Sequence, residues 1–182
     1  MTITLVTERL LIRDFTATDW QAVHTYASNP LVTQYMIWGP NTEHDTKAFI
    51  QRVIEMQGQS PRVDFEFAVT LRTNGQIIGG VGIHVSDRQG EIGYCFHPDY
   101  WRQGYASEAA AAMLRFGFQE LGLHRIYAKC RPDNIGSASV MKKIGMTYEG
   151  HLREHLFYKG KWHDSFQYSI LEHEFMGEMH GN

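Results

Sequence analysis

The stretch EIGYCFHPDYWRQGYASEAA, residues 91–110, decides the fold. Its first part, Glu91–Phe96, predicts a strand, and a loop separates this strand from a helix predicted over Ser107–Glu120. A second strand is predicted at Arg125–Cys130. Because a strand–helix–strand crossover joins parallel neighbours, this passage predicts a parallel strand pair inside the sheet.

The sequence on both sides of this passage predicts antiparallel strands and covering helices. Asn74-Gly75 is a two-residue hairpin signal, and Lys159-Gly160 marks a second turn near the C-terminus. We therefore predict an α+β fold with a mixed, mostly antiparallel twisted sheet that helices flank. The further strands expected are Arg9–Phe15, Phe65–Leu71, Gln76–Val85, Met146–Phe157 and Trp162–Leu171; the further helices expected run from Thr18, over Thr46–Gln57 and over Ile135–Ile144, with Leu31–Pro40 a short helix or loop.

Length and composition indicate one domain over residues 1–182, with 43% apolar residues to fill a core. Seventeen basic and twenty acidic side chains give a net charge of −3, which argues against nucleic acid or a membrane surface as a partner. No apolar run reaches the ~20 residues of a membrane helix, the N-terminus lacks a signal-peptide pattern, and two cysteines make no disulfide framework. We therefore expect a cytoplasmic protein, monomeric or homodimeric, whose residues 173–182 form a flexible tail.

Two strand-to-helix junctions carry polar groups that suit a phosphorylated ligand. The loop Arg102–Ser107 leads straight into a helix, whose first N–H groups are unpaired and whose dipole is positive at that end. Gly104 lets those amides surround an anion, although a glycine there would serve equally to ease a turn. At the second junction Asn134 and Ser137 either bind the ligand or cap the next helix, and Lys143 is either a phosphate partner or a solvated side chain.

Short motifs along almost the whole chain carry a family resemblance. Trp101–Ala106 is similar to the acyl-CoA signature (Arg/Gln)-x-x-Gly-x-(Gly/Ala) of the GNAT acetyltransferase superfamily, with Trp101 in place of the usual Arg or Gln. The chain resembles most closely the RimJ/RimL ribosomal-protein acetyltransferase branch of that superfamily. The matching motifs are Thr7–Arg13 (TERLLIR), Glu91–Tyr94 (EIGY), Asp133–Ser137 (DNIGS), Glu149–Arg153 (EGHLR) and Gly160–Asp164 (GKWHD).

The resemblance implies that two central parallel strands splay apart and that acetyl-CoA lies in the wedge between them. The pyrophosphate would rest on the loop amides, Asn134 would hydrogen-bond the pantetheine, and Ser137 would face the thiol as the catalytic hydrogen-bond donor. The implied activity is that of an acetyl-CoA-dependent N-acetyltransferase, which moves the acetyl group directly to a primary amine in a ternary complex. The cofactor-binding residues so expected are Cys95, Phe96, Trp101, Arg102, Gln103, Gly104, Tyr105, Ala106, Ser107, Asn134, Ser137 and Lys143.

Acetyl transfer needs a neutral amine close to the thioester and a donor for the developing oxyanion. Glu91, which begins the strand beside the thioester, is the expected catalytic base, and Glu154, His84 and His97 are the alternatives. A backbone N–H near Cys95–Phe96 is the expected oxyanion donor.

The segment between the first strand and the second helix, together with the last hairpin, is expected to bind the acceptor. Its aromatic side chains would line the acceptor site or belong to the core. The branch suggests a protein N-terminus as acceptor, while a polyamine or other small amine, and a non-catalytic CoA-binding sensor, stay open as alternatives. No metal is expected, because His151 and His155 lack the Glu of an HExxH motif, and Cys95 is expected to be a core residue rather than a nucleophile. The expected acceptor-binding residues are Tyr35, Trp38, His84, Glu154 and Tyr158.

Overall fold

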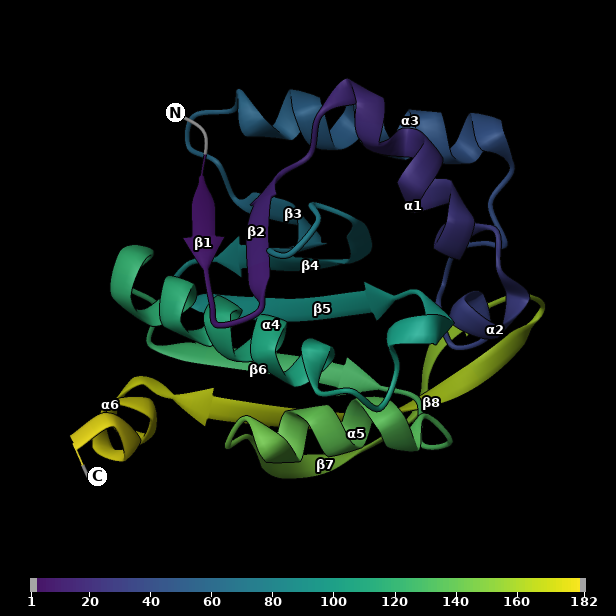
Figure 1. Cartoon of the computed structure of the whole chain (residues 1–182). Helices are drawn as coiled ribbons and strands as arrows, with labels where there is room; N and C mark the ends of the chain where they lie inside the picture. The colour runs from purple at the N-terminus through teal and green to yellow at the C-terminus, as the bar shows by residue number, and fades with distance from the viewer. Residues whose placement is uncertain (1–2, 181–182) are drawn as a thin grey trace.

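The structure is a computed structural model that describes the backbone of residues 3–180 and the side chains of residues 3–177. An eight-stranded sheet runs through it in the order β1-β2-β3-β4-β5-β6-β8-β7 (Figure 1). No helix of the described residues is both long and apolar enough to cross a membrane. In chain order the elements are β1 (Thr4–Val6), β2 (Leu10–Asp14), η1 (Ala17–Asp19), α1 (Trp20–Ala27), α2 (Pro30–Thr33), α3 (Glu43–Gln57), β3 (Asp64–Leu71), β4 (Ile77–Ser86), β5 (Gln89–Phe96), η2 (Pro98–Tyr100), α4 (Tyr105–Arg115), the π-helical turn η3 (Phe116–Glu120), β6 (Arg125–Cys130), α5 (Ile135–Lys143), β7 (Thr147–Tyr158), β8 (Lys161–Leu171) and α6 (Glu172–His180).

Strands β5 and β6 form the parallel pair of this sheet, and the other neighbouring strands pair antiparallel. The parallel pairing ends at Glu91–Tyr127. Beyond that position β5 continues to Phe96 and β6 to Cys130 without pairing to each other in the described structure, so the two strands part. The predicted α+β fold with a splayed central parallel pair is confirmed.

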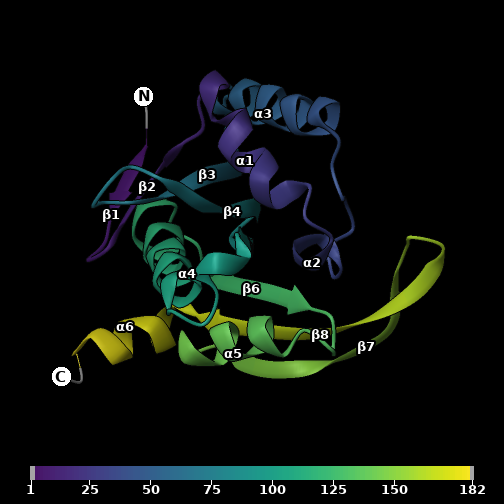
Figure 2. The ribbon, with the colours of Figure 1, turned by 45° about the vertical axis from the view of Figure 1, so that its right-hand side comes forward.

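Helices cover both faces of the sheet. Helices α1 and α3 pack over β3 and β4 on one face, and α4 packs over β2, β4 and β5 on the other (Figures 1 and 2). Phe67 and Ala68 show the division, because successive residues of a strand point to opposite faces. Phe67 belongs to the core cluster that contains Met113 of α4, and Ala68 to the cluster that contains Val23 of α1. We call these two sides of the sheet the α4 face and the α1 face.

Several element boundaries differ from the sequence prediction. The sequence analysis does not predict β1, because this strand has only three residues and none of them is fully buried. The first helix begins at Trp20 after a turn in which the Asp19 carboxylate accepts a hydrogen bond from the Thr16 N–H at 2.7 Å. Helix α4 begins at Tyr105, earlier than predicted, because Gly104 already adopts the conformation that opens the helix.

Part of the segment predicted to be a flexible tail, residues 173–182, is helical in the structure. Residues Glu172–His180 form α6, while residues 181–182 lie outside the described residues. Phe175 is buried, and its ring centroid lies 5.0 Å from that of Phe118. The many polar side chains near the C-terminus conceal this apolar anchor in the sequence.

We expect Phe175→Ala to lower the free energy of unfolding by about 3 kcal/mol, because it removes a buried ring and leaves a cavity against Phe118. Urea denaturation measures the change. His173→Ala, on an exposed position of the same helix, is the matched control and should change stability little. Equal stability of the two variants would show that α6 does not dock on the domain.

Candidate active site

The loop before α4 brings backbone amides and two cationic side chains together. Gly104 has a φ of +83° and directly precedes the first turn of α4, Tyr105–Ser107, and Arg102 also has a positive φ of 59°. A Cβ atom on Gly104 would lie 3.2 Å from Arg9 Nη2 and 3.9 Å from Lys143 Nζ. Helix-start amides and two neighbouring cations suit an anion, and a side chain at Gly104 would intrude between them.

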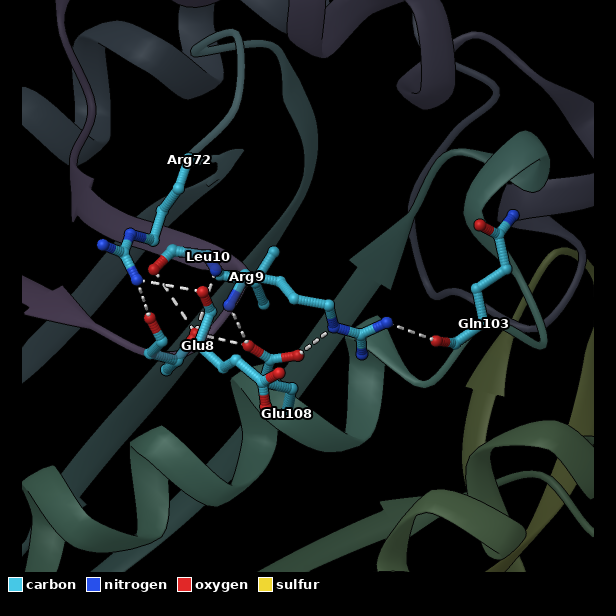
Figure 3. Close-up of polar contacts among 7 residues, drawn as sticks. Glu8, Arg9, Leu10, Arg72, Gln103 and Glu108 are labelled. Carbon is cyan, nitrogen blue, oxygen red and sulfur yellow. Dashed lines mark hydrogen bonds and ion pairs between the residues drawn. The ribbon is translucent and has the colours of Figure 1, made fainter.

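Arg9 fastens the start of β2 to this loop (Figure 3). Its Nη1 donates to the Gln103 carbonyl at 2.9 Å, its Nε donates to Glu108 Oε2 at 2.7 Å, and its guanidinium lies 4.3 Å from the centre of the Tyr105 ring. Glu108 also accepts hydrogen bonds from the Thr7 hydroxyl at 2.6 Å and the Arg9 N–H at 2.8 Å. These contacts fix the loop conformation before any ligand arrives.

Sequence reasoning missed the contact role of Arg9. The residue lies inside the quoted motif Thr7–Arg13, yet its partner Gln103 is 94 positions away in the chain. Local periodicity carries no signal for so distant a contact.

The second junction is bridged by hydroxyl groups. Asn134 Oδ1 accepts a hydrogen bond from the Ser137 N–H at 3.1 Å, so this side chain caps α5. The Tyr94 hydroxyl lies 3.0 Å from Ser137 Oγ and donates to the Ser137 carbonyl, also at 3.0 Å. Burial raises the pKa of Tyr94, so its phenol keeps its proton. Tyr94 therefore links β5 to α5 across the diverging strands, a role that the sequence analysis did not assign.

The end of β5 presents an amide toward the gap between β5 and β6. The His97 N–H donates to the Ile78 carbonyl of β4 at 2.9 Å. Because N–H groups alternate in direction along a strand, the preceding N–H of Phe96 points away from β4. The Trp101 indole N–H donates to the Phe96 carbonyl at 2.8 Å and so holds this strand end in place.

Glu91 occupies the last paired position before the strands part. It lies opposite His84 on β4 and Tyr127 on β6, and its Oε1 is 3.1 Å from Lys129 Nζ. The pKa of Tyr127 is raised by burial and further by the carboxylate of Glu91. His84 itself is held by Asp64, whose Oδ1 lies 2.5 Å from His84 Nδ1. The proposed base thus stands in a row of charged groups at the apex of the wedge.

A second carboxylate, Glu66 of β3, lies on the same face of the sheet in the neighbouring row, opposite Gly82 of β4, and was not predicted. A Cβ atom on Gly82 of β4 would lie 2.6 Å from Glu66 Oε2, so the carboxylate leans over Gly82 toward β5. The next residue in that row is Gly93, and a Cβ atom there would meet nothing within 4 Å. Two glycines in register leave open space in front of this carboxylate.

The surroundings of Glu66 favour its protonated form. Burial raises the pKa of Glu66 to about 7, and the charge of Asp64 adds to this, while Arg52 and Arg62 oppose it. Burial, followed by the charge of Glu66, raises the pKa of Cys95 to about 12. A thiol that keeps its proton is a poor nucleophile, which agrees with the expectation that Cys95 is a core residue.

The two cysteines are free thiols. Cys95 packs against the cluster on the α1 face, and Cys130 belongs to the cluster on the α4 face. The sheet itself therefore stands between them.

Two of the aromatic residues predicted to bind the acceptor lie together. The Tyr158 hydroxyl donates to the Tyr35 carbonyl at 3.4 Å, and the Tyr35 hydroxyl donates to the Asp133 carbonyl at 3.2 Å. Tyr158 is buried and stacks on His163 with ring centroids 3.8 Å apart, so its ring is part of the packing. Trp38 stays 38% exposed.

Glu154, one of the alternative bases, lies where β7 bulges between Leu152 and Leu156. Glu154 has a φ of +47°, and its N–H donates to Asp164 Oδ1 at 2.8 Å. His97, another alternative base, uses its Nδ1 to accept the Asp99 N–H at 3.3 Å. Among residues 3–177 no three metal-binding side chains gather into a site.

The raised pKa of Glu66 makes a prediction about stability. Between its ordinary pKa of 4.5 and about 7, the folded protein binds a proton that the unfolded chain releases. Folding stability therefore falls as the pH rises through this range. Glu66→Gln has no carboxyl group to titrate here and does not lose stability in this way. The free energy of unfolding of the variant, minus that of the unmodified protein, should therefore be greater at pH 8 than at pH 4.5.

Urea denaturation at the two pH values measures this difference. Glu120→Gln, at an exposed position, is the control and should shift stability equally at both. A Glu66→Gln effect that does not change with pH would contradict the buried environment.

Comparison with known proteins identifies the family. The model of the acetyltransferase (GNAT) domain matches residues 9–147. An uncharacterized N-acetyltransferase of Bacillus subtilis, YnaD, is 43% identical over 172 residues, which is 93% of this chain and 98% of the relative. A GNAT-family acetyltransferase from Bacillus anthracis superposes with a TM-score of 0.85 at 39% identity, covering 94% and 99% of the two chains. Spermidine N-acetyltransferase from Vibrio cholerae, solved with CoA and spermine, shares the fold at 21% identity and a TM-score of 0.79, over 93% and 99% of the chains. The chain belongs to the GNAT family of N-acetyltransferases.

Proposed function

We propose that the protein transfers the acetyl group of acetyl-CoA directly to a primary amine while both substrates are bound. The observation that carries this proposal is the parting of β5 and β6 after Glu91–Tyr127, at whose side the amide loop around Gly104 opens α4. The unpaired edge of β5 suits an extended chain, and the amide loop suits an anion. Acetyl-CoA has both, in its pantetheine arm and its pyrophosphate.

In this proposal the pantetheine arm pairs with the free edge of β5 from Ile92 to Phe96. The pyrophosphate lies on the amides of Arg102–Ser107, with the charges of Arg9 and Lys143 beside it. Unpaired backbone groups along β5 need partners, and the amides of pantetheine can supply them.

Glu91 is proposed to take the proton from the acceptor ammonium, which frees the lone pair of the amine. The nitrogen then attacks the thioester carbon, the C–N bond forms, and the oxyanion receives a hydrogen bond from the Phe96 N–H. The C–S bond breaks with its electron pair going to sulfur, and the extra proton on the nitrogen passes to this thiolate, which gives the neutral amide and the CoA thiol. The Ser137 hydroxyl, held against Tyr94, hydrogen-bonds the sulfur as it departs. Glu66 is a second candidate for the base, because its pKa of about 7 is well placed for proton transfer at neutral pH.

A protein N-terminus is the proposed acceptor, as the RimJ/RimL branch suggests, and a polyamine is the alternative that the spermine-bound relative suggests. Thiol release from acetyl-CoA tests this with peptides that begin with Ser or Ala and with spermidine. We expect faster release with peptides. Faster release with spermidine would favour the polyamine, and release with neither, despite CoA binding, would leave a CoA-binding sensor.

The same assay identifies the base. Removal of a general base costs about 10²–10⁴-fold in rate, so Glu91→Gln should lower kcat by at least 100-fold. Glu66→Gln is the comparison variant. If Glu66→Gln abolishes turnover while Glu91→Gln leaves it intact, the base is Glu66.

We expect Arg9→Gln to weaken CoA binding at least tenfold, because it removes a cation and the two hydrogen bonds that shape the loop. Isothermal titration calorimetry with CoA measures the loss. Arg72→Gln is the matched control, since Arg72 Nη1 donates to the Thr7 and Glu8 carbonyls at 2.9 Å on the same segment but away from the loop (Figure 3). Equal effects of the two variants would mean that Arg9 acts only through β2.

A further inference from the structure

Arg131, which follows β6, is an arginine without a polar partner. Its Nη1 is buried and donates to no acceptor. Among the described residues its guanidinium has neither a hydrogen bond nor an ion pair. Its one described contact is with the ring of Tyr158, whose centre lies 5.9 Å away. A buried donor without an acceptor is costly, so such a group calls for an explanation.

The other half-buried arginines show what this one lacks. Arg13 pairs with Asp19 at 2.7 Å, and Arg62 pairs with Asp14 at 2.8 Å. Arg125, the first residue of β6, pairs with Glu149. In each case this chain supplies a carboxylate to the guanidinium. Arg131 is the half-buried arginine for which the described residues supply none.

The neighbours of Arg131 add positive charge. Lys129 lies two residues earlier on β6 and therefore on the same face of the sheet. The pKa of His155 is lowered by burial and then by the charges of Lys129 and Arg131, so these two cationic groups lie near His155. Glu91, the carboxylate whose charge acts on His155, is already paired with Lys129. The cluster has an excess of cationic groups over carboxylates.

This cationic cluster, Lys129 and Arg131, lies on the acceptor side of the wedge. Residues 127, 129 and 131 alternate with Ile126, Ala128 and Cys130, which face α4, so the cluster faces the other way, with Glu91. The phosphate loop opens α4 on the opposite face, so CoA phosphates are not the partners of Arg131.

The last hairpin closes this region from the side. Strands β7 and β8 extend away from the sheet and curve toward α2 (Figure 2). Lys159, at the turn between them, donates from Nζ to the Thr33 carbonyl at 2.7 Å, and Tyr158 reaches the Tyr35 carbonyl. The hairpin and the α2 segment therefore meet at Tyr158, and the Arg131 guanidinium lies 5.9 Å from the centre of its ring.

We propose that Arg131, with Lys129, binds a carboxylate of the acceptor, so that the acceptor is a peptide with an acidic side chain near its N-terminal amine. This inference rests on the proposed acetyl transfer and names its substrate class. A guanidinium fork matches a carboxylate with two parallel hydrogen bonds, which gives orientation as well as affinity. The amine then lies toward Glu91 and the acidic side chain toward Arg131. From residue 127, opposite Glu91, to residue 131 the strand path is about 13 Å, which suits a side-chain carboxylate better than the α-carboxylate of a free amino acid.

Matched peptides test the inference on the unmodified protein. Ser-Asp and Ala-Glu peptides are compared with Ser-Asn and Ala-Gln peptides in the thiol-release assay at saturating acetyl-CoA. We expect a KM at least tenfold lower for the acidic peptides. Equal values within each pair, or a preference for spermidine, would overturn the proposal. Free alanine is also compared with alaninamide. If the preference for free alanine is as strong as the preference for Ser-Asp over Ser-Asn, an α-carboxylate suffices, and the assignment to an acidic side chain is overturned.

Variants locate the effect. Arg131→Gln should remove the preference for acidic peptides and leave the KM for acetyl-CoA and for the amide peptides unchanged, and Arg131→Lys should retain part of it. Arg115→Gln, at an exposed position on α4, is the control. An unchanged preference in Arg131→Gln overturns the proposal, and circular dichroism of each variant checks that it is folded.

A binding measurement separates this inference from the proposed function. If no amine is acetylated, the proposed function fails, and calorimetric titration of N-acetylated Ser-Asp and Ser-Asn peptides into the CoA-bound protein still tests the anion site. Tighter binding of the acidic peptide, lost in Arg131→Gln, supports the site. Equal binding of the two peptides overturns it.

Discussion

The parting of β5 and β6 is the constraint on which the rest of this site depends. Two parallel strands that stay paired would satisfy each other's backbone groups and leave no edge for a ligand. Here the pairing stops at Glu91–Tyr127, and the freed edge of β5 needs other partners. The hydrogen bond from Tyr94 to Ser137 connects the diverging elements on the α4 face, so the gap is bridged at one side instead of collapsing. An extended, amide-bearing arm fits such a gap because it can replace the missing strand.

Charge is distributed so that the two faces of the sheet favour different ligands. On the α4 face Arg9 and Lys143 flank the amide loop, and both are cationic. On the α1 face the carboxylates Glu66 and Glu91 lie in neighbouring rows of β3 and β5, and the cations Lys129 and Arg131 lie on the other side of the gap. The net charge of −3 conceals this division, because opposite local excesses cancel in the sum. An anionic cofactor and an amine acceptor are thus drawn to opposite sides of one wedge.

The sequence predicts the parts of this arrangement that depend on local pattern. Alternation indicates the strands, Asn74-Gly75 marks its hairpin, and Gly104 at the start of a helix indicates the anion loop. Contacts between distant segments are not periodic and were missed. Arg9 reaches Gln103 across 94 positions, and Glu66 becomes notable only because Gly82 of another strand lies beneath it. Helix α6 was missed for a related reason, since one buried ring outweighs a polar composition.

Glu66 and Arg131 are both half-buried ionisable groups without an ion-pair partner of opposite charge among the described residues. A half-buried carboxylate and a half-buried guanidinium each normally find an oppositely charged partner, and the described residues supply neither with one. Both lie on the α1 face, at either side of the apex formed by Glu91 and Tyr127. A protein tolerates such a cost where function requires it, because the partner arrives with the ligand. One molecule that carries both an amine and a carboxylate satisfies the two groups at once, whereas a polyamine satisfies only the first and leaves the guanidinium as it is.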